Sequence, residues 1–172
     1  KSLSVADDSG ITAITLSGRD GEDDNLTYTL VTNPSPGTLS GTAPNLTYTS
    51  KGKCSGHDRF TLKVTAGRLA SSAATVTIVV TAVNHAPVAS AQSVTVAEDS
   101  SNNAITLSGR DGEDDNLTYT LVTNPSQGTL SGTAPNLTYT PKGNFSGQDS
   151  FTFKVNDGNL DSSAATVTTV VK

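Results

Sequence analysis

The chain has 172 residues, contains no tryptophan or methionine, and carries a formal net charge of -5 with an isoelectric point near 4.8. Because nucleic acids and anionic membranes attract clusters of lysine and arginine, this acidic balance excludes nucleic acid as an expected partner. No apolar run approaches the roughly 18 residues of a membrane-spanning helix, so we also expect no membrane insertion. The abundance of threonine, serine, valine, alanine, glycine and asparagine favours strands and turns.

The first half of the chain reads as a series of short strands. Apolar and polar side chains alternate with a period of two, and no stretch has helical periodicity. The segment 33–37, Asn-Pro-Ser-Pro-Gly, marks a turn that a central strand would not tolerate, and 51–58 is a polar loop. About seven such strands predict an antiparallel β-sandwich of immunoglobulin-like type. The predicted strands are 2–6, 13–17, 26–32, 38–40, 46–49, 59–64 and 73–80.

The second half of the chain repeats the first. Residues 14–35 recur unchanged as 105–126, and 37–49 recur as 128–140, with a period of 91 residues. This period is too long for a solenoid unit and suits a small domain that folds on its own. We therefore predict an all-β chain of two tandem sandwiches, residues 1–83 and 84–172. We expect the first repeat to be N-terminally truncated and the chain to be an excised fragment of a longer protein.

Three carboxylates stand at alternate positions in one loop of the second repeat. Asp111, Glu113 and Asp115 lie between the apolar run 104–107 and the alternating run 117–121, so they occupy a connection between two strands. The first repeat contains the same loop. Hard oxygen ligands gathered on a loop suit Ca²⁺ better than other common ions. The alternative is a solvated turn whose charges only keep the surface soluble.

No catalytic pattern is present in the sequence. It contains no nucleophile elbow, no phosphate-binding loop and no carboxylate pair framed by aromatic residues, so we predict no enzymatic activity, no catalytic residues and no organic cofactor. Cys54 is the single cysteine and its counterpart is Phe145, which excludes an internal disulfide and favours a buried apolar side chain. His57 and His85 lack a second histidine or cysteine at ligand spacing and are expected on the surface.

A family resemblance is carried mainly by the second repeat. In order, it contains Val-Ala-Glu-Asp at 96–99, Asp-Gly-Glu-Asp-Asp at 111–115, Leu-Thr-Tyr at 117–119, and Gly-Gln-Asp-Ser-Phe-Thr-Phe-Lys-Val-Asn-Asp-Gly at 147–158, preceded by Val-Asn-His-Ala-Pro-Val at 83–88. This order resembles the cadherin-like and immunoglobulin-like tandem repeats of large bacterial secreted or surface proteins, over nearly the whole chain. The resemblance implies an extracellular or cell-surface location.

The resemblance also implies a set of metal ligands. Animal cadherins hold Ca²⁺ at each junction between domains, and an antiparallel sandwich would bring the matching strand ends together at one pole. The chain departs from that family in having Asn84 and His85 where the linker carries further acids, and in having Asp7 where the second repeat has Glu98. Whether calcium sits at the junction, within each repeat, or both is left open. The matching positions are Asp7, Asp58, Asn84, Asp111, Glu113 and Asp157.

Two functions are compatible with these features. The first is a calcium-stiffened structural or adhesive module, whose partners are neighbouring repeats of the parent chain and, outside that chain, polysaccharide or another cell-surface protein. The second is a carbohydrate-binding accessory module of a secreted hydrolase, which would normally expose a platform of aromatic rings. The four tyrosines fall at alternating strand positions and are expected in the core, which favours the first function. They are Tyr28, Tyr48, Tyr119 and Tyr139.

Overall fold

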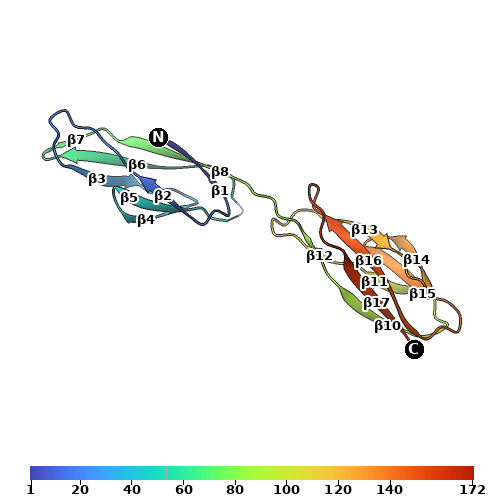
Figure 1. Ribbon diagram of the computed structural model, residues 1–172. Helices are drawn as coiled ribbons and strands as arrows, with labels where there is room; N and C mark the ends of the chain where they lie inside the picture. The colour runs from blue at the N-terminus through green and yellow to red at the C-terminus, as the bar shows by residue number, and fades with distance from the viewer. Residues whose placement is uncertain (53) are drawn as a thin grey trace. The chain divides into compact units, whose positions relative to one another are not determined.

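The computed structural model describes residues 1–52 and 54–172, and over these residues the chain is all-β (Figure 1). Lys53, which belongs to the predicted loop 51–58, lies outside the described residues. The chain separates into two compact units, Lys1–Val83 and Asn84–Lys172, each with its own hydrophobic core. Within the described residues, no helix has the length and apolar character needed to cross a membrane.

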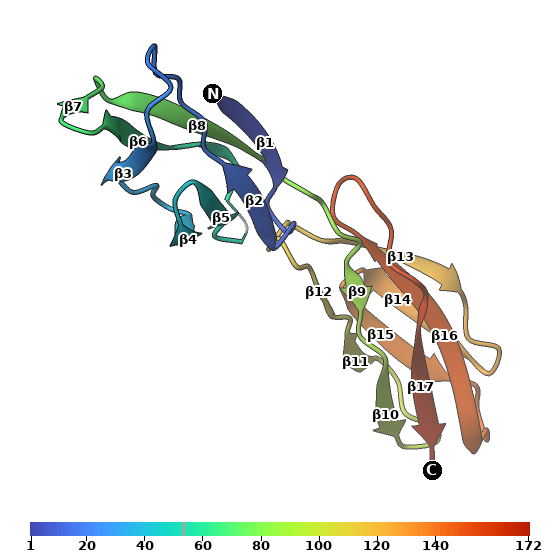
Figure 2. The same ribbon diagram turned by 60° about the vertical axis from the view of Figure 1, so that its left-hand side comes forward.

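The first unit is a sandwich of two sheets (Figures 1 and 2). One sheet has the strand order β1-β8-β6-β3, with the short strand β7 added to β6, and the other has the order β2-β5-β4. The strands are β1 (Ser2–Ala6), β2 (Ile11–Thr15), β3 (Leu26–Thr32), β4 (Thr38–Thr42), β5 (Asn45–Thr49), β6 (Gly56–Ala66), β7 (Leu69–Ala70) and β8 (Ala74–Thr81).

The second unit repeats this arrangement. Its two main sheets have the orders β10-β17-β16-β13 and β11-β15-β14, and a short pair, β12-β9, is added. The strands are β9 (Val88–Ala89), β10 (Gln92–Val96), β11 (Asn103–Thr106), β12 (Gly109–Arg110), β13 (Thr118–Thr123), β14 (Gly128–Thr133), β15 (Asn136–Pro141), β16 (Gly147–Asn156) and β17 (Ala165–Val171). The predicted all-β fold of two immunoglobulin-like or cadherin-like sandwiches is thus confirmed.

The pairing of the outer strands differs from the purely antiparallel prediction. β1 pairs parallel with β8, and β10 pairs parallel with β17. β1 and β8 are the first and last strands of the first unit, whereas in the second unit the short strand β9 precedes β10. In each pair an even number of chain reversals separates the two strands. They therefore run in the same direction, and lying side by side they can only form a parallel ladder.

The strand boundaries also shift in one place that matters for the site. The sixth strand was predicted to begin at residue 59, after a polar loop, whereas β6 begins at Gly56. Asp58 therefore lies inside a strand, on the same face as the buried side chains of Phe60 and Leu62. Side chains two positions apart in a strand share a face, so this aspartate is directed into the core.

Tyrosine and phenylalanine rings fill both cores. Tyr48 and Tyr139 are fully buried, while Tyr28 and Tyr119 are half-buried and pack against the cores, as the alternation predicted. In the second unit Tyr119 stacks on Phe153, with ring centroids 6.3 Å apart. None of the four tyrosines is therefore a freely exposed ring.

The first core has less ring area than the second. Leu62 takes the place of the fully buried Phe153, and Cys54 takes the place of Phe145, which packs against the second core. Cys54 is a free, half-buried thiol beside a small cavity of about 30 Å³ that Tyr48 and Val80 also line. Because burial of apolar surface contributes roughly 25 cal/mol per Å², the first unit should be the less stable of the two.

Thermal unfolding of the whole chain should accordingly occur in two steps, with the first unit melting at the lower temperature. Phe153→Leu should destabilise the second unit by about 1–2 kcal/mol, because it removes part of a fully buried ring. Differential scanning calorimetry should then show the upper transition shifted downward and the lower one unchanged. Coincident melting of the two units in the unmodified chain would contradict this ranking.

Candidate functional site

The acidic loop of the second unit is folded around one carboxylate. Oδ2 of Asp111 accepts hydrogen bonds from the backbone N–H groups of Glu113 and Asp115, at 2.8 and 2.9 Å. The loop passes through Asp114 with a left-handed φ of 64°, a conformation that aspartate tolerates. The other oxygen, Oδ1 of Asp111, is buried and accepts no hydrogen bond, and it is the one such side-chain atom in the described part of the chain.

Glu113 of the same loop is bound to the start of the second unit. Its Oε1 lies 2.8 Å from Nδ1 of His85, and its Oε2 accepts a hydrogen bond from the His85 backbone N–H at 3.1 Å. The histidine side chain is about half exposed, as the sequence predicted, whereas that of Glu113 is 22% exposed. The beginning of the unit is thereby attached to its acidic loop.

Asp157, in the turn after β16, is a third carboxylate at this end of the unit, and it is buried. Its Oδ1 accepts hydrogen bonds from the backbone N–H groups of Asn159 and Leu160, both at 2.7 Å. Its Oδ2 accepts one from Nδ2 of Asn84 at 2.9 Å. The backbone bonds from Leu160 and Asn159, aided by Asn84, hold the pKa of Asp157 below its usual value, so the group is ionised at neutral pH.

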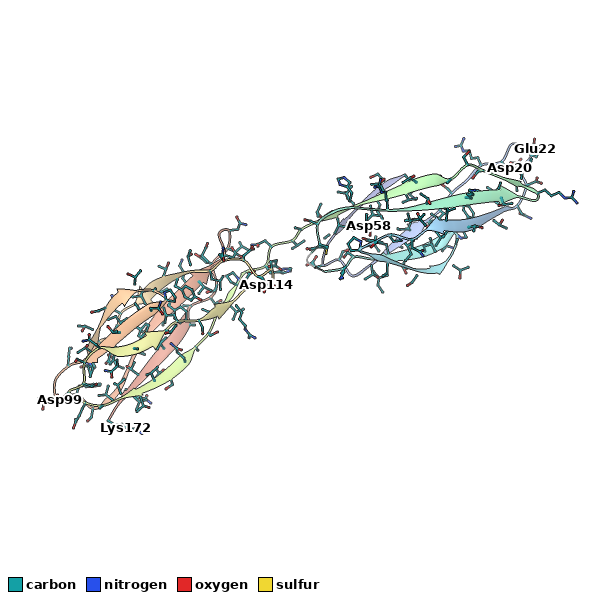
Figure 3. All side chains as sticks on the ribbon, turned by 180° about the vertical axis from the view of Figure 1, so that it is seen from behind. Asp20, Glu22, Asp58, Asp99, Asp114 and Lys172 are labelled. Carbon is teal, nitrogen blue, oxygen red and sulfur yellow. The ribbon has the colours of Figure 1, made fainter. Side chains whose placement is uncertain are left out.

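Four of the six predicted metal ligands thus belong to one connected group in the second unit. Figure 3 shows Asp114 of the acidic loop at the end of this unit opposite Asp99 and Lys172. Within the described residues, no three or more histidine, cysteine or acidic side chains are arranged as a formed metal cage. Each carboxylate is instead held by hydrogen bonds of its own. The four residues are Asn84, Asp111, Glu113 and Asp157.

The other two predicted ligands lie in the first unit. Asp7 is buried, and its Oδ1 accepts a hydrogen bond from the Val83 backbone N–H at 3.2 Å. Asp58 lies at the end of the unit opposite Asp20 and Glu22 (Figure 3). A metal-binding role for Asp7 and Asp58 stays a prediction.

Asp58 has a structural role that the sequence analysis missed. Its Oδ1 accepts hydrogen bonds from the backbone N–H groups of Ser35 and Arg59, both at 2.8 Å. Its Oδ2 accepts hydrogen bonds from the Gly37 N–H and the Tyr48 hydroxyl, both at 2.9 Å. The carboxylate therefore ties the turn after β3 to strands of both sheets. The signal available in the sequence was its inward position on an alternating strand.

In the second unit, Asp149 holds the equivalent turn in the same way. Its carboxylate accepts hydrogen bonds from the backbone N–H groups of Ser126, Gln127 and Ser150 and from the Tyr139 hydroxyl, at 2.8 to 2.9 Å. Burial opposes ionisation of Asp149, but the bonds from Ser126, Gln127 and Tyr139 outweigh it and lower its pKa. Burial also raises the pKa of Tyr139 and, in the first unit, that of Tyr48 to about 12, so both tyrosines remain neutral donors.

The acidic loop of the first unit has the same local fold but fewer companions. Oδ2 of Asp20 accepts hydrogen bonds from the N–H groups of Glu22 and Asp24, at 3.1 and 3.2 Å. However, Ala66 stands where the second unit has Asp157. The two loops therefore have the same sequence, but the residues around them differ.

Comparison with known proteins identifies the family. Residues 1–79 and 84–170 each match the family model described as a bacterial Ig domain. The chain belongs to the bacterial Ig domain family. The resemblance seen in the sequence is thereby confirmed, and the two units are tandem bacterial Ig domains. The comparison with curated proteins gave no match.

Several solved structures resemble these tandem Ig domains. A crystal structure of human CDH23 EC21-23 matches with 14% identity and a TM-score of 0.62, covering 100% of this chain and 72% of that one. Human mucin-like protocadherin EC1-2 matches with 17% identity and a TM-score of 0.53, covering 99% and 95%. At these identities the likeness shows a shared cadherin-like fold.

A third similar structure belongs to a larger enzyme. The endo-fucoidan hydrolase MfFcnA4_H294Q from glycoside hydrolase family 107 matches with 24% identity and a TM-score of 0.41. The match covers 100% of this chain but only 28% of the hydrolase, so the tandem Ig domains correspond to a minor part of that enzyme's length.

The hydrogen-bonded carboxylate of Asp149 leads to a prediction about stability at acidic pH. Asp149→Asn should lower the free energy of unfolding of that unit by about 2–3 kcal/mol at pH 7, because it weakens charge-assisted hydrogen bonds. The folded pKa of Asp149 is lowered, so its contribution is present above the unfolded value of about 4 and is lost as the pH falls through the folded pKa.

Urea unfolding of both proteins at pH 7 and near pH 2 measures this effect. The difference between the native chain and the Asp149→Asn variant should be large at pH 7 and should shrink at pH 2. A difference of the same size at both pH values would show that the charge of Asp149 is not what stabilises the turn.

Proposed function

We propose that the chain is a non-catalytic structural or adhesive module of a large extracellular bacterial protein, and that its second Ig domain binds calcium. A tandem immunoglobulin-like and cadherin-like fold fits a structural or adhesive role. The observation that carries the calcium proposal is the buried oxygen of Asp111 that has no hydrogen-bond partner.

The unpartnered oxygen is costly without a cation. A buried polar group that lacks a partner costs about 1–3 kcal/mol, and more when the group is charged. A divalent cation at this position would remove that cost, and calcium is the common ion that prefers carboxylate and amide oxygens. Asn84, Asp111, Glu113 and Asp157 are the residues that would hold it. To do so, calcium would compete with His85 for Glu113 and with the Asn84 amide group for Asp157.

The first Ig domain provides an internal contrast. Its acidic loop has the same sequence, but Ala66 replaces Asp157, and Asp20 has no buried oxygen without a partner. We therefore expect calcium to bind the loop of the second domain more tightly than that of the first.

Calcium bound at these residues would also restrict the connection between the repeats. Asn84 directly follows Val83, the last residue of the first unit. A cation that fixes Asn84 against the acidic loop would limit the backbone dihedral angles of the connecting segment. The proposed role is therefore that of a calcium-stiffened module whose partners are neighbouring repeats of the parent chain.

The alternative function, a carbohydrate-binding accessory module of a secreted hydrolase, usually depends on an exposed aromatic platform. In this chain Tyr48 and Tyr139 are buried, and Tyr28 and Tyr119 pack against the cores. This arrangement supports the structural module as the first choice.

Calcium should stabilise the second domain in a way that depends on its acidic loop. Extracellular calcium modules bind with dissociation constants of about 10⁻⁴ to 10⁻³ M, so roughly 10 mM calcium should add about 1.4–2.7 kcal/mol to the free energy of unfolding. Calorimetry should show the second domain melting several degrees higher in calcium than in chelator. The variant Asp111→Ala with Glu113→Ala should lose this response.

The first domain supplies the matched control. Asp20→Ala with Glu22→Ala makes the same change in an identical loop and should leave the calcium response of the second domain intact. If the scans of the native chain in calcium and in chelator superimpose, the proposed site does not bind calcium.

Stiffening of the connection is a separate prediction. Calcium should raise the backbone ¹⁵N heteronuclear NOE values of residues 82–86, because these residues lose fast motion when Asn84 is held. The Asp111→Ala with Glu113→Ala variant should show no rise. Unchanged NOE values in the native chain, together with a raised melting temperature, would mean that calcium binds without stiffening the connection.

A further inference from the structure

Each Ig domain has a polar hollow on the outside of its larger sheet. In the first domain it has a volume of about 530 Å³ and lies between the turn after β3 and the outer faces of β6 and β8. In the second domain the equivalent hollow has a volume of about 540 Å³. Both volumes are within the range of about 300–1,000 Å³ that is usual for ligand sites. The hollow is thus a feature of the repeat, and none of the proposed calcium ligands Asn84, Asp111, Glu113 and Asp157 lines it.

The hollow is held by a rigid framework. Its floor contains a cross-strand pair, in which Oγ1 of Thr32 and Oγ1 of Thr61 lie 2.8 Å apart and the Thr61 backbone N–H donates to Thr32 Oγ1. Its wall is the turn that Asp58 holds through the backbone N–H groups of Ser35 and Gly37. A site formed before the ligand arrives avoids much of the entropy cost of ordering protein groups on binding.

The chemistry of the lining excludes apolar ligands. The residues that line the first hollow have hydroxyl, amide, imidazole, guanidinium or carboxylate side chains. Such a surface offers many hydrogen-bond donors and acceptors and little apolar area. A ligand that matches it must carry polar groups over most of its surface, as a saccharide does.

Two positions distinguish the hollows of the two domains. His57 and Arg59 of the first hollow correspond to Gln148 and Ser150 of the second. Because β6 alternates, His57, Arg59 and Thr61 face outward while Asp58 faces the core. Both basic side chains are exposed, and in the part of the chain that the structure describes they form no ion pair and no side-chain hydrogen bond.

We propose that the hollow of the first Ig domain binds acidic saccharides. The guanidinium group of Arg59 offers the paired N–H donors that match the two oxygens of a carboxylate or sulfate group. The hydroxyl group of Thr75 and the amide group of Asn33 are available to the ring hydroxyls. The hollow of the second domain, which has neutral side chains at both positions, binds the same saccharides weakly.

The carboxylate of Asp58 does not prevent anion binding. Asp58 lines the hollow, but it is only 2% exposed, and its two oxygens accept hydrogen bonds from four donors of the protein. These donors offset most of its charge. Asp149 has the same role in the second domain, so the difference between the hollows comes from the residues at 57 and 59.

Affinity gel electrophoresis of the whole chain in chelator, at low salt, tests the proposal without calcium bridging. The probes are polygalacturonate for carboxylated sugars, dextran sulfate for sulfated sugars, dextran for neutral sugars and single-stranded DNA as an unrelated polyanion. The native chain should be retarded by at least one of the acidic polysaccharides and not by dextran or DNA. Which acidic probe retards it identifies the anionic group preferred.

The two domains supply matched variants. His57→Gln with Arg59→Ser copies the second hollow into the first and should weaken binding roughly tenfold, as expected for the loss of a charge-assisted contact. Arg68→Ser removes an exposed positive charge outside the hollow and should change binding less than twofold. Adding Gln148→His with Ser150→Arg to the first variant should restore binding through the second domain. Thermal unfolding of each variant checks that the fold is retained.

Several outcomes would overturn the proposal. Retardation by DNA as strong as that by the acidic polysaccharides would indicate unspecific attraction of polyanions. If Arg68→Ser weakened binding as much as His57→Gln with Arg59→Ser does, binding would depend on net charge and not on the hollow. The proposal would also be wrong if neither acidic polysaccharide retarded the native chain, or if replacing His57 and Arg59 left the retardation unchanged. None of these results bears on calcium, because chelator is present throughout.

Discussion

The structure of each repeat depends on one buried carboxylate. Asp58 in the first unit and Asp149 in the second accept hydrogen bonds from the turn between two strands, from their own strand and from a tyrosine of the opposite sheet. Gly37 lies so close to Tyr48 that a Cβ there would clash with the ring. An ionised group in the core is tolerated only when it is fully hydrogen-bonded, so turn, strand and tyrosine must be in place together.

The duplication makes each unit a control for the other. Both have a buried aspartate that holds the turn between two strands, and both have the same acidic loop, yet the residues around these features differ. The second unit has Asp157 beside its loop, where the first has Ala66, and the first has Arg59 in its hollow, where the second has Ser150. Under our two proposals, calcium binds mainly to the second repeat and the acidic saccharide to the first.

Whether the acidic loop is a candidate metal site depends on the residues around it. The hydrogen bonds within the loop are the same in both repeats, because they join residues two and four positions apart. Among the residues that the structure describes, only the second repeat has a buried side-chain oxygen without a partner, Oδ1 of Asp111. Burial in a low-dielectric environment strengthens electrostatic interactions, so the same carboxylate becomes a better ligand when its neighbours exclude water.

The sequence by itself determined the repeat, the all-β class and most strand positions, since a period-two alternation and glycine-proline turns are local features. It also predicted that Tyr48 and Tyr139 are buried. Tertiary structure decided the parallel pairing of β1 with β8, the four hydrogen bonds of Asp58 and the unpartnered oxygen of Asp111. The parallel pair joins residues more than 70 positions apart, and the bonds that tie Asp58 to the turn after β3 span more than 20 positions. Local periodicity carries no information about such partners, because they meet only when distant parts of the chain come together in the folded domain.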